Sequence, residues 1–144
     1  MKTIRFVIFS ALIMLFAFMG ASAQKAQVLI QIDSLGVMKN AAGTIYATIS
    51  KDTIIKDYKG EKIAIIGRNG NLIDKNGTLL GKTAKNGDFH NAKNDIEYTV
   101  QPSLKGNTYD VYDHTGVRIM VVAANYKRQA GSMAYLYKNI VPNR

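Results

Sequence analysis

The chain has 144 residues, of which 47% are hydrophobic, and its 19 basic and 10 acidic side chains give a formal net charge of +9. It contains no cysteine, which excludes a disulfide framework and a thiolate metal site. The length is that of one small domain.

The N-terminus has the order of features of a secretory signal peptide. Lys2 and Arg5 precede a largely apolar run over 6–19, and small residues follow at Ala21 and Ala23. We therefore expect cleavage after residue 23, leaving a single domain over 24–144 with a net charge of about +7, in the periplasm or outside the cell. The run is shorter than the ~20 residues that a spanning helix needs, so no membrane span is expected after cleavage. Without a cysteine there is no acceptor for a lipid anchor.

A hairpin motif recurs five times along the middle of the chain. The copies span 36–49, 53–66, 70–83, 87–100 and 109–122; the first four are 17 residues apart, and an insertion within 101–108 delays the fifth. Each turn opens with Asn or Asp and closes with Gly or Asn: Asn40 and Gly43, Asp57 and Gly60, Asp74 and Gly77, Asn91 and Asn94, Asp113 and Gly116. An apolar core column stands two residues before the openers: Met38, Ile55, Leu72, Phe89 and Val111.

These positions have physical causes. An Asn or Asp side chain at the turn opening accepts a hydrogen bond from a backbone N–H two residues later, and the closing position needs a positive φ, which Gly adopts freely and Asn tolerates. Alternate residues of a strand share a face, so the apolar column should line one interior.

The predicted fold is all-β, with five two-stranded hairpins around a common axis, closed by N- and C-terminal strands. A hairpin of this size is not stable alone, so its copies must bury their faces against one another. A ring of petals removes exposed sheet edges, and an open solenoid is the structural alternative. Helices are not expected within 24–122.

Residues 36–122 contain five copies of an Asp/Asn-x-x-Gly/Asn turn, and the chain is small and expected to be exported. In these features it resembles the five-fold β-flower family of small secreted bacterial proteins. The resemblance implies a shape rather than an activity, since it carries over no catalytic motif. We expect the resemblance to extend to 130–137.

Three segments lie outside the repeat. Residues 26–33 are predicted to form a strand that pairs at the ring closure, and 101–108 a loop. The small and aromatic residues of 131–137 fit either a strand or a short helix, and we favour the strand because two-stranded petals leave little room for a packed helix.

No catalytic or metal-binding constellation is evident. His90 and His114 fall in different columns of the repeat, and Asp113, which with Asp110 and His114 could ligate a cation, already has a turn role. The glycines are accounted for by turns, and no Gly-x-Ser-x-Gly elbow occurs. We expect neither enzyme activity nor a cofactor; a small hydrolase is the weakest alternative.

Basic residues recur with the repeat. Lys51, Arg68 and Lys85 occupy one position of three connections between hairpins, while Lys59 and Lys93 share a turn position at the opposite end. Such a rim would attract anions, although exposed lysines also serve solubility. The sequence favours an exported scaffold or binding module of the cell envelope, with an envelope protein or an anionic glycan as partner. The alternative is binding of anionic polysaccharide or lipid head groups through the rim. Nucleic acid is not an expected partner.

Overall fold

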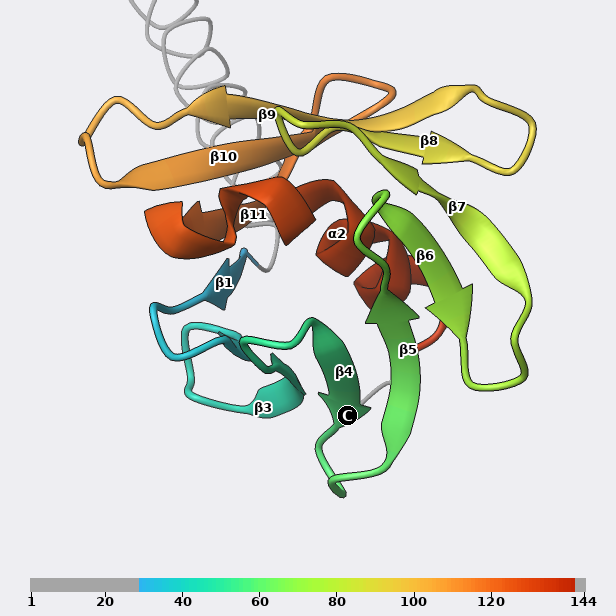
Figure 1. Cartoon of the computed structure of the whole chain (residues 1–144). Coiled ribbons are helices and arrows are strands. Elements are labelled where there is room, and N and C mark those ends of the chain that lie inside the picture. The colour runs from blue at the N-terminus through green and yellow to red at the C-terminus, as the bar shows by residue number, and fades with distance from the viewer. Residues whose placement is uncertain (1–28, 142–144) are drawn as a thin grey trace, which may run out of the picture.

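The computed structural model describes residues 29–141, which form a closed barrel of strands around one helix (Figure 1). The predicted signal peptide lies outside these residues. The strands are β1 (Ile30–Ile32), β2 (Val37–Lys39), β3 (Ile45–Ile49), β4 (Ile54–Asp57), β5 (Lys62–Ile66), β6 (Asn71–Asp74), β7 (Leu79–Thr83), β8 (Phe89–Asn91), β9 (Ile96–Pro102), β10 (Thr108–Asp113) and β11 (Arg118–Ala123). A 3₁₀ segment, η1 (Ala124–Gln129), and the helix α2 (Ala130–Asn139) follow. The expected all-β class is confirmed, with one helix added.

The barrel is a meander in which each strand pairs antiparallel with the next. Because eleven strands is an odd number, the first and last run in the same direction, and β1 closes the ring by parallel pairing with β11, Ile30 facing Met120. The closure rules out the open solenoid. Strands of successive hairpins are also paired, as in Ala47 opposite Asp57, so the hairpins form one continuous sheet.

The turns within the five hairpins use their side chains in one way. The Oδ1 atom of Asp74 accepts hydrogen bonds from the backbone N–H groups of Asn76 and Thr78, both at 2.9 Å. Asp57, Asn91 and Asp113 accept from the same two positions at 2.9–3.0 Å, and Asn40 from Thr44 at 3.0 Å. The closing residues Gly43, Gly60, Gly77 and Gly116 have φ of 83–84°, and Asn94 has φ of 67°.

Replacing Gly77 with valine should lower the free energy of unfolding by about 1–3 kcal/mol, since a β-branched residue is strained at φ of 83°. No atom lies within 4 Å of an added Cβ, so this cost is purely conformational. Denaturant unfolding measures it, and Gly77→Asn is the matched control, because Asn tolerates this region. Equal stability of the valine variant and the wild type would contradict the turn assignment.

Each hairpin carries a register shift directly after its core-column residue, for example between Leu72 and Ile73. In β3 this bulge turns two successive side chains, Tyr46 and Ala47, to the interior, and the same happens at Ile63 and Ala64. The alternation of buried and exposed side chains along the second strand of a hairpin is therefore interrupted at the bulge.

The core column lies in the barrel interior. Met38, Ile55, Leu72, Phe89 and Val111 are all fully buried. Three of them face small residues across their hairpin, at Ala47, Ala64 and Gly81.

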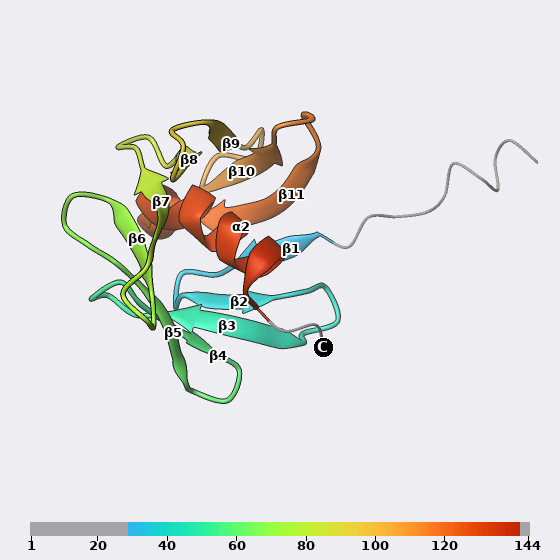
Figure 2. The same ribbon diagram turned by 90° about the vertical axis from the view of Figure 1, so that its right-hand side faces the viewer.

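The expectation of a closing strand over 131–137 is wrong, because this segment lies within α2. Figures 1 and 2 show the helix inside the ring of strands, and it packs mainly against β7 to β11. A ring of this many strands has an interior wider than its own side chains fill, so the helix completes the core. Its small residues permit close approach: Gly131 donates its backbone N–H to the Gly87 carbonyl at 3.0 Å.

The insertion within 101–108 is a loop only in part. Gln101 and Pro102 extend β9, and Thr108 begins β10, and the two strands pair as far as Pro102 opposite Tyr109. The remaining residues form a turn in which the Gly106 N–H bonds the Ser103 carbonyl at 3.3 Å.

Candidate functional site

Three connecting turns at one end of the barrel carry the predicted basic rim. Lys51, Arg68 and Lys85 each follow the first residue of a four-residue turn, over 50–53, 67–70 and 84–87. In each turn the fourth N–H bonds the first carbonyl at 2.9–3.0 Å, and the closing residue has a positive φ. Because successive strands are antiparallel, alternate turns fall at opposite ends, and these three lie side by side at the same end.

The three side chains line one hollow of about 660 Å³. Ile65, Ile66 and Thr83 line it from β5 and β7. Arg128 and Gln129, which sequence reasoning missed, complete it. The hollow therefore has four cationic side chains around it, of which one comes from outside the repeat.

The 3₁₀ segment η1 brings Arg128 and Gln129 to this end. The Asn125 amide donates to the Ser34 carbonyl at 2.9 Å, and the Tyr126 hydroxyl donates to the Ile49 carbonyl at 3.4 Å. At its other side the chain is held by the bond from Gly131 to Gly87. The segment thus spans from the turn 33–36 to the turn 84–87, and the hollow remains beside it.

The electrostatic balance at this end is positive. Of the lining residues only Asp52 is acidic, and the two ion pairs found within residues 29–141, Lys39 with Asp33 and Arg118 with Asp110, involve none of the four cations. The first turn of α2, which starts at the hollow, has no acidic residue, so the helix dipole adds to the positive potential.

One residue that lines the hollow has an unsatisfied polar atom. The Oε1 atom of Gln129 is buried and has no hydrogen-bond partner in the part of the chain that the structure describes. Thr83 is satisfied, because its hydroxyl bonds that of Ser132 on α2. Thr53 is also satisfied: its hydroxyl lies 2.5 Å from the Ile66 carbonyl and 2.6 Å from that of Asp52.

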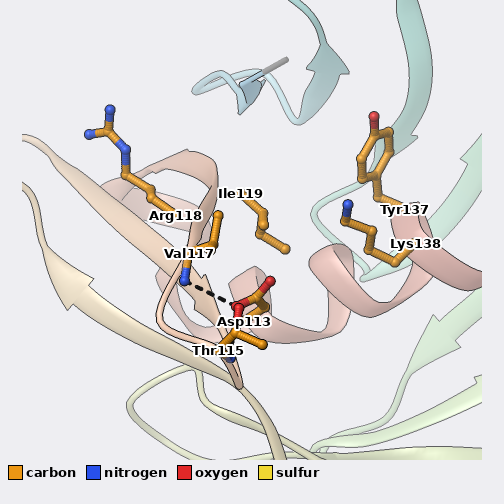
Figure 3. A pocket seen from close by; sticks show the side chains of 7 residues that line it. All are labelled: Asp113, Thr115, Val117, Arg118, Ile119, Tyr137 and Lys138. Carbon is orange, nitrogen blue, oxygen red and sulfur yellow. Dashed lines mark hydrogen bonds between the residues drawn. The ribbon is translucent and has the colours of Figure 1, made fainter. Parts of the chain in front are cut away.

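The other end of the barrel has a different character. Lys59 and Lys93 lie in the hairpin turns there and do not line the hollow of the rim. A second hollow, of about 430 Å³, lies between the turn 113–116 and the end of α2, with Asp113, Arg118 and Lys138 around it (Figure 3). This second hollow is therefore lined by side chains of both charge signs.

The carboxylate of Asp113 is hydrogen-bonded within its own turn. A hydrogen bond from the Thr115 hydroxyl lowers the pKa of its carboxyl, burial opposes this, and backbone N–H bonds from Val117 and Thr115 lower the pKa further. Figure 3 shows the bond from Val117 to this carboxylate, at 3.0 Å. An ionised carboxylate held in this way is a poor proton donor for catalysis.

The remaining candidates for chemistry are dispersed. Asp110 accepts a hydrogen bond from the Ser103 hydroxyl at 2.7 Å and lies 3.6 Å from Arg118. His90 is on β8 with its Nδ1 atom buried, whereas His114 is in a hairpin turn. Within 29–141, no three His, Asp or Glu side chains are grouped to hold a metal ion.

Comparison with protein-family models finds no family that matches the chain, and no curated protein or solved structure is significantly similar to it. No helix within the described residues is long and apolar enough to cross a membrane.

Proposed function

We propose that the protein is an exported, non-enzymatic binding module of the cell envelope that holds an anionic ligand at the end of the barrel carrying Lys51, Arg68, Lys85 and Arg128. One observation carries the proposal: three cations from one repeat position, and a fourth from η1, line the same hollow without a carboxylate partner in the described structure. Potentials of one sign in a hollow attract ligands of the other.

The scaffold suits binding because it is rigid. Closure leaves no sheet edge to pair with another chain, and each connecting turn holds its cation on a hydrogen-bonded frame. Little conformational entropy is then lost when a ligand arrives.

We further propose that the five hairpins are copies of one petal and that the chain is a five-fold β-flower protein. The recurring register shift and the identical turn chemistry support this. Export, which the signal-peptide pattern of residues 1–23 predicts, would place an acidic polysaccharide or the anionic head groups of lipids within reach.

The test compares two triple variants with equal loss of charge. Lys51→Ala/Arg68→Ala/Lys85→Ala removes the rim, whereas Lys59→Ala/Lys75→Ala/Lys93→Ala removes exposed turn lysines from the opposite end. Binding is measured to immobilised polygalacturonate, and to vesicles of phosphatidylglycerol in phosphatidylcholine, across a range of salt concentrations.

We expect the rim variant to bind at least about tenfold more weakly and to lose most of the salt dependence, because screening acts on the removed charges. The control should stay within about threefold of the wild type. Equal losses in both variants would show that only net charge matters, and absence of binding to both surfaces would refute the proposed function. The two surfaces distinguish a glycan from a lipid source of the anion.

A further inference from the structure

The residues around the hollow at the basic end offer two kinds of hydrogen-bonding group, donors and an acceptor. The four cationic side chains around it are exposed hydrogen-bond donors, which suit an anionic group. Gln129, which also lines the hollow, carries the unsatisfied atom: its buried side-chain oxygen, which accepts hydrogen bonds and repels anions.

Such a buried acceptor normally has a partner. Leaving it unpaired is unfavourable, and native structures keep few of these groups. The neighbouring hydroxyls of Thr53 and Thr83 already have their own partners. Because this oxygen is buried, the Gln129 side chain must rotate toward the hollow, and a hydroxyl group on the ligand would then satisfy it.

The size of the hollow limits the ligand. A volume of about 660 Å³ is within the ~300–1,000 Å³ of small-molecule pockets. It therefore accommodates one or two sugar-sized rings rather than a long stretch of polymer. Ile65, Ile66 and Ala84 offer an apolar wall against which the carbon face of a ring can pack.

Building on the proposed function, we infer that the hollow binds one acidic sugar unit, with its charged group at the rim and a ring hydroxyl donating to Gln129. The anionic group can be a carboxylate, as in a uronic acid, or a phosphate, as in a sugar phosphate. The terminal unit of an acidic polysaccharide would enter in the same orientation.

The test is titration calorimetry of the purified protein with matched probes. Galacturonate is compared with acetate, glucose 6-phosphate with inorganic phosphate, and glucose serves as the neutral sugar. At least one acidic sugar should bind about tenfold more tightly than the simple anion with the same charged group, and also more tightly than glucose. One additional net hydrogen bond is worth roughly that factor.

Gln129→Leu should remove this preference, so that the acidic sugar binds no more tightly than the simple anion with the same charged group. The variant should melt no lower than the wild type, because the carbonyl it removes has no partner to lose. Asn76→Leu, an exposed amide in a turn at the opposite end, is the matched control and should behave as wild type.

Two results would overturn the inference while leaving the proposed function intact: equal affinity for acidic sugars and simple anions, or an unchanged preference in Gln129→Leu. Failure of the polysaccharide, the vesicles and every anionic probe to bind would instead refute the proposed function itself.

Discussion

Replacing Leu72 with aspartate is expected to unfold the domain. Leu72 is fully buried, facing Gly81 on β7 and Ile66 on β5. Truncating a buried leucine costs about 2–5 kcal/mol, and burying a carboxyl without a partner adds several more. The sum approaches the ~5–15 kcal/mol that stabilises a typical domain. Far-UV circular dichroism and denaturant unfolding would measure the loss.

Leu79→Asp provides the matched control for this variant. Leu79 lies in the same hairpin but is 49% exposed, so the same change there should cost little. Leu72→Met, which conserves volume, should lose less than about 1.5 kcal/mol. A Leu72→Asp protein that melts like the wild type would mean that the core column does not hold the barrel together.

Replacing Gly131 with valine is expected to cost about 2–4 kcal/mol. A Cβ at this position would lie 2.4 Å from the Gly87 carbonyl oxygen and 2.8 Å from the Phe89 backbone nitrogen. These are backbone atoms of the turn 84–87 and of β8, so α2 would have to move away and lose its hydrogen bond to Gly87. Overpacking contributes about 1–3 kcal/mol and the lost bond about 1 kcal/mol.

Whether Gly131→Ala raises or lowers the stability of the protein is the sharper test. In an exposed helix, Gly→Ala is stabilising by about 1 kcal/mol, whereas Gly131→Ala should be destabilising because the same clash applies. Lys138→Val, at an exposed position of α2, should cost only a few tenths of a kcal/mol. A rise in melting temperature for Gly131→Ala would show that the helix does not press against the wall.

Much of the barrel was predictable because it is built from local rules. The turn at Asp74 and Gly77 needs only an acceptor side chain and a residue that tolerates positive φ, both of which are visible in the sequence. The burial of Leu72 follows from its fixed distance to that turn. The bulge, by contrast, makes both Ile63 and Ala64 buried, which no simple alternation predicts.

The candidate site was half predictable. Lys51, Arg68 and Lys85 share a repeat position, so their common end followed from periodicity alone. Arg128 and Gln129 could not be placed this way, because η1 lies outside the repeat and reaches the hollow through bonds to Ser34 and Ile49. For Thr83 the sequence did carry a signal, because it is a polar residue at a repeat position that is apolar in the other four copies: Ile49, Ile66, Val100 and Val122.

The sequence by itself determined the turns, the hairpin period and the interior face, since each depends on contacts between residues close together in the chain. Only the tertiary structure decided that residues 130–139 form a helix inside the ring, and that Arg128 and Gln129 join the rim. Small and aromatic residues are compatible with either a strand or a helix, and the choice depends on the shape of the space that the assembled strands enclose. That space exists only once eleven strands have closed, so no local pattern encodes it.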